Sequence, residues 1–454
     1  MVWPSDELFA SRVLVDRVRE EESFIPLRQP MQNKFYESFD TDRIETDKTG
    51  GSGDYRTPFQ IDRDRIIHTS SFRRLQNKTQ VFFSGEYDFY RTRLTHSIEV
   101  AQIGRSICNR LNCTSDLLSD DYSIDADLVE AACLSHDIGH PPFGHTGERT
   151  LHRLMKDCGG FEGNAQTLRI LTKILFGPGR GMNPSRALMD GVLKYKTLFG
   201  EIDDQKNHFI YAEQKPILDF VVGGDAFPET LPAGKARNEF KSIECQIMDW
   251  ADDTAYSLND IADGIHAGFI TVDKLVQWAE AQEGLSADDD VLIQELIKAM
   301  RDDRIESAIG KKIGAFINAA ELEESSGFLS GRTRRHLYRL VIDSEADAAR
   351  ALYKKISFGL VFQSRQLQQL DRKSDYILRR LFEVFAEQYI DPAPGVMKFK
   401  LLSDEEEGLI EDEETEAGRA RIVCDVLARM TDGIATRTYK RLFDADFGSI
   451  VDLI

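Results

Sequence analysis

LSHDIGHPPFGHTGE, residues 134–148, is the stretch from which the fold and the site of this chain can be predicted. Five of the nine histidines lie in or near it: His96, His136, His140, His145 and His152. Exposed histidines have no reason to cluster, whereas a site that binds a divalent cation and moves protons needs several imidazoles and carboxylates close together. The segment also carries Asp137 and Glu148, so it predicts a site of that kind.

The chain on both sides of this segment is predicted to be helical. Apolar residues follow His96 at steps of four and three residues, which is one helical face: Val100, Ile103, Ile107 and Leu111. A second helix is predicted from about Ala126 towards His136, and Gly139 with the two prolines after His140 ends it. We therefore expect His96 and His136 to point from two helices towards one interior.

Two further features favour a bound cation. Consecutive side chains of a helix diverge by about 100°, so His136 and Asp137 can reach one ion only where the helix is ending. Farther along the chain, Asp252, Tyr256 and Asp260 stand at i, i+4 and i+8 among apolar neighbours and form one row. That row faces either water or a cation.

Composition limits the class of protein. The chain has 454 residues, with 57 Lys and Arg against 77 Asp and Glu, and a formal net charge of −20. Such an acidic chain is not expected to coat duplex DNA, although a local basic groove can still hold a strand or a phosphorylated ligand. No apolar run approaches the roughly 18 residues that cross a bilayer, and the start of the chain has no signal-peptide pattern. These features, with six scattered cysteines, predict a cytoplasmic protein that does not enter a membrane.

The expected fold is mostly α, a multi-helix bundle with a small β-hairpin and a helical C-terminal region. We expect an N-terminal segment over residues 1–55, a catalytic core over 56–270 and the helical region over 271–454. The hairpin is predicted at Val81–Tyr90, where aromatic residues flank a turn. Residues 46–53 are expected to form a flexible loop, and the acidic run 404–416 a solvated face.

Several motifs occur in the order found in one known family, and they extend over roughly residues 56–266. They are residues 72–82 (FRRLQNKTQVF), 91–97 (RTRLTHS), 136–145 (HDIGHPPFGH), 161–166 (FEGNAQ), 193–195 (LKY) and 252–256 (DDTAY). The chain resembles the HD-domain deoxynucleoside triphosphate triphosphohydrolases, most closely the bacterial dGTPase branch. An isolated HD dipeptide would be weak evidence, whereas this ordered set is specific.

The resemblance implies roles for residues in the matching motifs. It implies one divalent metal ion, held by His96, His136, Asp137 and Asp252. Imidazole and carboxylate ligands suit manganese, magnesium, iron, cobalt or nickel and do not choose among them. His145 and Glu148 match the catalytic pair of the family, in which the carboxylate fixes the tautomer of the imidazole and raises its basicity.

The same resemblance implies how the substrate is held. Arg93, Lys194 and Tyr195 match residues that contact the phosphates, and Gln80 matches a glutamine that meets the sugar 3′-hydroxyl. Tyr256 and Asp260 continue the Asp252 row to the deoxyribose, where a tyrosine ring would exclude a 2′-hydroxyl. His140 also matches a family histidine, but its role stays open between supporting the metal and contacting phosphate.

The implied reaction is hydrolysis of a dNTP, with dGTP the first substrate to try, to a deoxynucleoside and inorganic triphosphate. Relatives form tetramers or hexamers, and some respond to an allosteric nucleotide or to single-stranded DNA, so the resemblance also implies a homo-oligomer with such partners. Two alternatives stay open: an HD hydrolase of cyclic nucleotides or guanosine alarmones, and a non-catalytic dNTP sensor. Motifs 72–82 and 252–260 argue against the first, and the intact His145 and Glu148 against the second. No motif identifies the residues that recognise the base.

Overall fold

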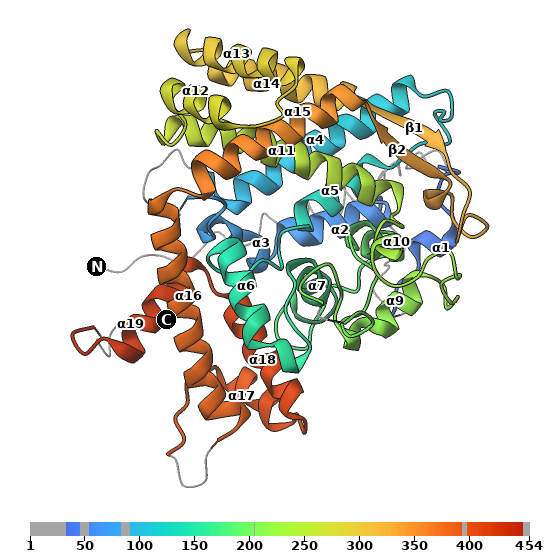
Figure 1. The fold of residues 1–454 in the computed structure, drawn as a ribbon. Coiled ribbons are helices and arrows are strands. Elements are labelled where there is room, and N and C mark those ends of the chain that lie inside the picture. The colour runs from blue at the N-terminus through green and yellow to red at the C-terminus, as the bar shows by residue number, and fades with distance from the viewer. Residues whose placement is uncertain (1–32, 46–53, 83–90, 204, 393–396, 448–454) are drawn as a thin grey trace, which may run out of the picture.

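The computed structural model describes residues 33–45, 54–82, 91–203, 205–392 and 397–447. Over these residues the protein is predominantly helical, as predicted (Figure 1). The described residues form two strands, β1 (Ala320–Glu324) and β2 (Tyr338–Ile342), which pair in antiparallel register. Among the same residues, no helix combines the length and apolarity that crossing a bilayer requires.

Three helices form the centre of the molecule. α4 (Arg93–Thr114) packs against both α5 (Ala126–Ser135) and α11 (Ile243–His266). α4 begins where Thr92 accepts a hydrogen bond from the Thr95 amide, and its predicted apolar face is buried. α2 (Pro58–Ile67) and α8 (Arg186–Val192) cover the other sides of α5. The remaining short helices are α1 (Ser38–Thr41), α3 (Ser70–Arg74), α7 (Gly163–Arg169), α9 (Lys215–Val221) and α10 (Lys235–Asn238).

A second group of helices packs on α11, at the top of Figure 1. It consists of α12 (Val272–Ala281), α13 (Ala287–Arg301), α14 (Ile305–Asn318) and α15 (Ser344–Ser357). Apolar side chains of this group, such as Leu275, Phe316 and Leu352, belong to the same hydrophobic core as those of α4 and α5. The main core thus extends across residue 270, and the proposed boundary there stays a prediction.

The C-terminal helices build a second core around α6 (Gly144–Leu154). They are α16 (Arg365–Phe385), α17 (Asp404–Glu411), α18 (Glu416–Arg429) and α19 (Asp432–Phe443). Leu151 of α6 packs in this core with residues of α16 and α18 such as Leu378, Leu381, Val423 and Leu427. The acidic run forms α17 and the turn after it, with most of its side chains exposed or half-buried.

Polar contacts also join the C-terminal helices to the segment 136–148. Lys78 donates from Nζ to the carbonyls of His140 (2.5 Å) and Ala428 (2.9 Å). Asp432 accepts hydrogen bonds from the amides of Phe143 (2.9 Å) and Thr79 (2.8 Å). The backbone of the histidine-rich segment is therefore held by Lys78, which precedes it in the sequence, and by Asp432, which follows it.

Two local predictions concern residues that lie partly or wholly outside the described ranges. Residues 83–90 of the expected hairpin and the whole loop 46–53 lie outside the described residues. Thr79 and Thr92, on either side of the first segment, form an isolated antiparallel bridge. The strands β1 and β2 were not predicted, because β1, AELEE, alternates over only four residues and carries three glutamates, a residue type that is depleted in strands.

Candidate functional site

A cavity of about 330 Å³ opens where α4, α6, α11 and the end of α5 meet. Eleven of the twelve predicted site residues line it: Gln80, Arg93, His96, His136, Asp137, His145, Glu148, Lys194, Tyr195, Asp252 and Tyr256. The twelfth, Asp260, does not line this cavity. The other lining residues are His140, Glu162, Asn164, Asn207, His208, Asp253, Lys354 and Phe362.

The four predicted metal ligands come together on one side of this cavity. Nε2 of His96 lies 3.2 Å from Oδ1 of Asp252, and Nε2 of His136 lies 3.6 Å from the same oxygen. Asp137 Oδ1 is 3.4 Å from the His136 Nε2. One ligand atom each from His96, His136 and Asp137 lies within 4.8 Å of the others, so a single cation could contact all three.

The hydrogen bonding of His136 fits a cation-binding role. Its Nδ1 lies 2.6 Å from the Cys133 carbonyl, so Nδ1 carries the proton and Nε2 presents a lone pair. This buried Nε2 has no hydrogen-bond partner among the described residues. Burial would lower the pKa of His136, but the charges of Asp137 and Asp252 raise it. The position therefore stabilises positive charge, which a divalent cation would supply.

The end of α5 allows adjacent residues to face one point. α5 ends at Ser135, and the turn that follows is closed by hydrogen bonds from the Ile138 amide to the Ser135 carbonyl and from the His140 amide to the Asp137 carbonyl. Thr167 then accepts from the Gly139 amide at 3.0 Å and donates to the His136 carbonyl at 2.9 Å. His136 and Asp137 thus leave the helix on a turn that α7 holds in place.

Gly139 is required by this close approach to α7. A Cβ atom at this position would lie 2.2 Å from both the Gly163 carbonyl oxygen and the Thr167 amide nitrogen. We expect Gly139→Ala to lower the free energy of unfolding by about 1–3 kcal/mol or more, measured by chemical denaturation. Gly310→Ala in α14, where a Cβ meets nothing within 4 Å, is the matched control and should be neutral or stabilising. A neutral Gly139→Ala would contradict the tight packing of this turn.

Two cationic side chains pair with the predicted metal-binding carboxylates. Arg93 Nη1 donates to Asp137 Oδ2 at 2.6 Å, and Lys194 Nζ to Asp252 Oδ2 at 2.9 Å. Lys194 also lies 2.9 Å from Asp249, a residue that the motifs did not single out. Burial raises the pKa of Asp252, but Lys194 and His136 lower it well below its usual range, so this carboxyl group stays ionised.

His145 and Glu148 stand at the mouth of the same cavity on the first turns of α6. His145 Nδ1 lies 3.3 Å from Glu148 Oε2, and the side chain of His145 is 57% exposed. Glu148 also accepts the Gly163 amide at 2.8 Å. Burial raises the pKa of Glu148, but the hydrogen bond with His145 and the charges of His140 and His145 lower it to about 2. Glu148 is thus a carboxylate across the physiological range and fixes the imidazole beside it.

Aromatic and polar groups occupy the far end of the cavity. The rings of Tyr256 and Phe362 are parallel to within 5° with centroids 6.2 Å apart, and Lys354 Nζ lies 5.4 Å from the Tyr256 ring centroid. Among the described residues, Gln80 Oε1 and Asp260 Oδ2 are buried without a hydrogen-bond partner. Buried polar atoms of this kind normally have partners, so both are candidates for ligand contact.

The motifs did not identify every residue of the cavity. Glu162 lies in the matched motif 161–166, where burial and the charge of Glu148 raise its pKa to about 8, but it was given no role. Lys354 and Phe362 come from a region without a matched motif, and only the packing of α15 and the following turn against α11 brings them here. The raised pKa of a carboxyl group close to Glu148 and the aromatic ring that faces Tyr256 can be recognised only in the three-dimensional structure.

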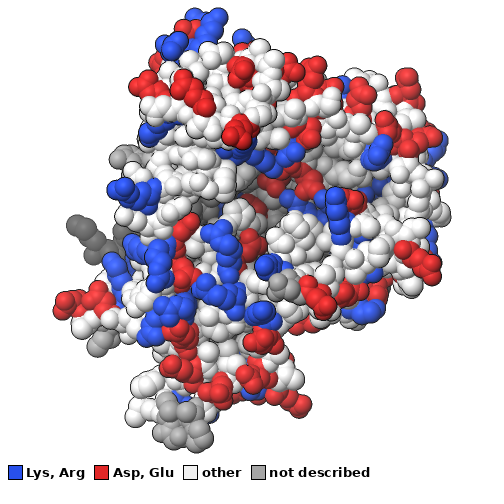
Figure 2. Space-filling view, in the orientation of Figure 1, with Lys and Arg blue, Asp and Glu red and all other residues white. Residues whose placement is uncertain are grey.

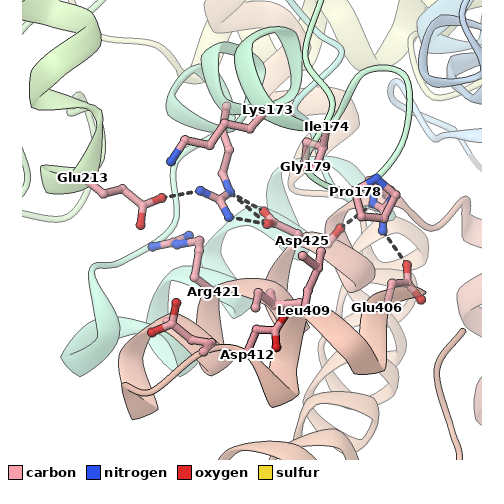
Figure 3. Close-up of a pocket in the computed structure, with 15 residues that line it drawn as sticks. Lys173, Ile174, Pro178, Gly179, Glu213, Glu406, Leu409, Asp412, Arg421 and Asp425 are labelled. Carbon is pink, nitrogen blue, oxygen red and sulfur yellow. Dashed lines mark hydrogen bonds and ion pairs between the residues drawn. The ribbon is translucent and has the colours of Figure 1, made fainter. Parts of the chain in front are cut away.

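A second pocket, of about 340 Å³, lies between α18 and the end of α7 and contains none of the predicted site residues (Figure 3). Arg169 pairs with Asp425 (2.7 Å) and Glu213 (2.5 Å), and Arg429 pairs with Glu406 (2.5 Å). The Arg169–Asp425 pair joins α7 to α18, whereas the Arg429–Glu406 pair joins two C-terminal helices, α18 and α17. The residues that line this second pocket include no histidine, in contrast to those of the first cavity.

Comparisons with known proteins agree with this arrangement. Residues 93–257 match the HD domain family, and residues 340–441 match the phosphohydrolase-associated domain family. A "Deoxyguanosinetriphosphate triphosphohydrolase-like protein" of Shewanella loihica is 35% identical over 440 residues, covering 88% of this chain and 96% of the relative. Relatives with the same name in Shewanella woodyi and Histophilus somni are 34% and 32% identical, covering 90% and 86% of this chain and 97% and 95% of their own. The chain is an HD-type phosphohydrolase and belongs to the HD-domain deoxynucleoside triphosphate triphosphohydrolase family, in its bacterial dGTPase branch.

Proposed function

We propose that this protein hydrolyses deoxynucleoside triphosphates, with dGTP the first substrate to test, to a deoxynucleoside and inorganic triphosphate. The observation that carries the proposal is a single cavity that joins the cation-binding group of His96, His136, Asp137 and Asp252 to the exposed His145. The names of the relatives support the substrate class. The cation is one divalent metal ion, and the protein is proposed to act in the cytoplasm.

The charges of the cavity suit a triphosphate. Such a substrate carries about four negative charges, so an acidic protein must concentrate positive groups locally to bind it. A bound divalent metal would polarise the α-phosphate and provide an ionised water at neutral pH. Arg93 and Lys194 lie beside the metal ligands and line the cavity, where they can donate to phosphate oxygens. Tyr195, whose ring stacks on His208 at 4.5 Å, is the third proposed phosphate contact.

His145 is proposed as the proton donor to the leaving group. Water adds to the α-phosphorus as the bond to the 5′-oxygen breaks, and that oxygen leaves as the deoxynucleoside after receiving a proton from the imidazolium. Glu148 orients the ring and stabilises its protonated form through the 3.3 Å contact with Nδ1. The exposed position of His145 at the mouth allows the proton to be replaced from solvent.

The far end of the cavity is proposed to hold the nucleoside. Gln80 and Asp260 each have a buried oxygen without a partner among the described residues, which supports contact with a sugar hydroxyl. Burial and the charge of Asp263 raise the pKa of Asp260 well above its usual range, which favours the neutral carboxyl group, a form that can donate a hydrogen bond. Along α11, Tyr256 lies between Asp260 and the proposed metal ligand Asp252, and it lines the cavity, where its ring can exclude a 2′-hydroxyl.

A product assay tests the proposal directly. Purified protein is incubated with each dNTP and Mn²⁺, and inorganic triphosphate is separated from pyrophosphate by ion-exchange chromatography. We expect triphosphate and a deoxynucleoside, with the signal lost in excess EDTA and restored by Mn²⁺, because the cation polarises the reacting phosphate. Pyrophosphate or a monophosphate would indicate another HD-type nucleotide hydrolase, and binding without any product would indicate a sensor.

Tyr256 is expected to control selection against ribonucleotides. Removing the ring in Tyr256→Ala should reduce the ratio of kcat/KM for dGTP over GTP by about 10-fold or more, because space opens for the 2′-hydroxyl. Tyr256→Phe keeps the ring and should keep most of the discrimination. The measurement is kcat/KM for both nucleotides, and equal selectivity in the wild type and the alanine variant would refute this role.

Other partners are proposed by similarity and are compatible with the surface. Lysines and arginines gather over α6 and α16 although the chain carries a net charge of −20 (Figure 2). The residues are Arg149, Arg153, Arg372, Lys373, Arg379 and Arg380. A face of this kind supports binding of an anionic partner such as single-stranded DNA or a second nucleotide. A homo-oligomer of four or six subunits remains part of the proposal.

A further inference from the structure

We propose that Lys196, paired with Asp190, is a positioning residue that holds the Lys194–Tyr195 segment in place to bind the substrate triphosphate. This inference rests on the proposed function, because it assigns a purpose to the phosphate contacts of the same cavity. It concerns a buried group of charges on the side of this segment away from the cavity. Lys196 itself is not among the residues that line the cavity, and its ammonium group pairs with Asp190.

In the short segment after α8, residues 194–196, neighbouring side chains point in different directions. Lys194 and Tyr195 line the cavity, whereas Lys196 is fully buried. Lys196 Nζ lies 2.9 Å from Asp190 Oδ1 and donates to the Leu193 carbonyl at 3.4 Å, so the side chain folds back onto the helix that precedes it. The amide of Lys196 donates to Asn238 at 2.9 Å. Lys196 is therefore fixed at both its backbone and its charged end.

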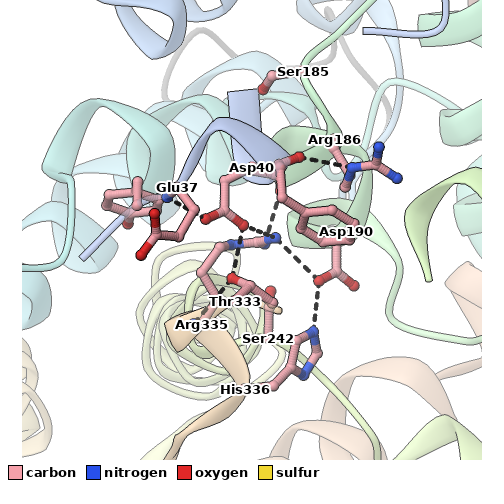
Figure 4. Close-up of polar contacts among 12 residues, drawn as sticks. Glu37, Asp40, Ser185, Arg186, Asp190, Ser242, Thr333, Arg335 and His336 are labelled. Carbon is pink, nitrogen blue, oxygen red and sulfur yellow. Dashed lines mark hydrogen bonds and ion pairs between the residues drawn. The ribbon is translucent and has the colours of Figure 1, made fainter. Parts of the chain in front are cut away.

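Asp190 belongs to a group of buried charges in which it is linked to Arg335 and His336 (Figure 4). Besides Lys196, it accepts a hydrogen bond from His336 Nε2 at 2.8 Å, and Arg335 Nη1 lies 3.2 Å from the same oxygen. All of these side chains are at least nine-tenths buried. Burial would raise the pKa of Asp190, but Lys196, His336 and Arg335 lower it well below its usual range. Asp190 therefore stays ionised and remains the ion-pair partner of Lys196.

The same group of charges also holds the other side of the phosphate site. Arg335 donates to Glu244 at 3.0 Å and to the Ala187 carbonyl of α8 at 2.9 Å. Glu244 lies in the first turn of α11, the helix that carries Asp249 and Asp252. Those two carboxylates are the partners of Lys194, each at 2.9 Å. Arg335 thus ties α8, which leads into Lys194, to α11, which carries the partners of Lys194.

Charge is better suited than apolar packing to this task. A buried ion-pair group is weak as a source of stability, because taking the charges out of water costs about as much as their attraction returns. Ion pairs and hydrogen bonds do fix atoms at set distances, whereas aliphatic side chains can repack by sliding. Lys194 must hold its ammonium group within hydrogen-bond reach of a phosphate, and a shift of about 1 Å can lower a rate about 100-fold. Loss of the Lys196 charge removes one buried partner of Asp190 and is expected to lower stability as well, so the positioning role is expected to appear as weaker phosphate binding by the folded variant.

The test uses the full-length Lys196→Met and Lys196→Arg variants. Lys196→Met keeps much of the side-chain volume but removes the charge, and Lys196→Arg keeps the charge. For Lys196→Met we expect KM for dGTP to rise by about 10- to 100-fold with a smaller change in kcat, and the Kd for inorganic triphosphate, measured by calorimetry with Mn²⁺, to rise in parallel. Lys196→Arg should recover at least part of both. Asp190→Asn is a second route to the same loss if Lys196→Met does not fold.

A matched control separates positioning from general destabilisation. Asp425→Asn breaks the buried pair with Arg169, outside the cavity, and should lower the Tm without changing KM or the Kd for triphosphate. If Lys196→Met lowers only the Tm and leaves both constants unchanged, the inference is wrong. If the wild type binds triphosphate but does not hydrolyse any dNTP, the proposed reaction fails, and the Kd comparison still decides the role of Lys196.

Discussion

Asp137→Ala is expected to abolish metal binding and hydrolysis together. Asp137 Oδ1 faces His136, and its second oxygen holds Arg93 at 2.6 Å, so the substitution removes a ligand and releases a proposed phosphate contact. The loss of the metal alone should cost several kcal/mol of transition-state stabilisation, or about 10³-fold in kcat/KM. Bound metal is measured by elemental analysis of the purified variant, and activity by release of triphosphate.

Two further variants separate the loss of metal binding from misfolding. Asp120→Ala, at an exposed position far from the cavity, should keep wild-type metal content and activity. His136→Ala should behave like Asp137→Ala, because it removes the Nε2 lone pair from the same point. An Asp137→Ala protein that lacks metal but hydrolyses dNTPs at the wild-type rate would remove the basis of the ligand assignment.

Glu148→Gln should lose most turnover and retain its metal. The amide cannot stabilise an imidazolium as a carboxylate does, so His145 would lose its orientation and its proton affinity. We expect kcat to fall by about 10²- to 10⁴-fold, the usual range for a general acid, with KM changed little. His145→Ala should give a similar loss, because the two side chains act as one unit.

Metal content is the decisive measurement for this pair. His140, His145 and Glu148 offer ligand atoms within 4.8 Å of one another, so they could in principle hold a cation of their own. If Glu148→Gln reduces bound metal in proportion to activity, these residues act as ligands and not as a proton-transfer pair. Asp157→Asn, on an exposed turn after α6, is the control and should change neither quantity.

The helical fold could be predicted because its signals are local. The apolar residues after His96 became the buried face of α4, and Gly139 with the following prolines ended α5 within a few residues of the expected position. The mostly helical fold is confirmed. The sheet formed by β1 and β2 was missed, because backbone pairing stabilises two strands of which the first, AELEE, is rich in glutamate and alternates over only four residues.

The site could be predicted in part because its motifs lie in sequence order. The matched motifs, with Glu148 just after one of them, named eleven residues that line one cavity, while their chemical roles stay predictions. Lys354 and Phe362 could not be found, since only the packing of α15 and the residues after it on α11 brings them to Tyr256. The pairing of Lys194 with both Asp249 and Asp252 likewise depends on two elements about 55 residues apart.

The contacts that hold α6 determine which fragments of this chain could keep an intact site. Its inner face packs against α16 and α18, Asp432 accepts the Phe143 amide, and Ala428 accepts a hydrogen bond from Lys78, which also donates to the His140 carbonyl. A fragment ending near residue 340 would keep every proposed metal ligand yet leave the helix of His145 and Glu148 without the surface that orients it. Such a fragment could still take up metal while being inert towards nucleotides. The last hundred residues are therefore expected to be indispensable for turnover, because they orient α6 and because Lys354 and Phe362 line the cavity.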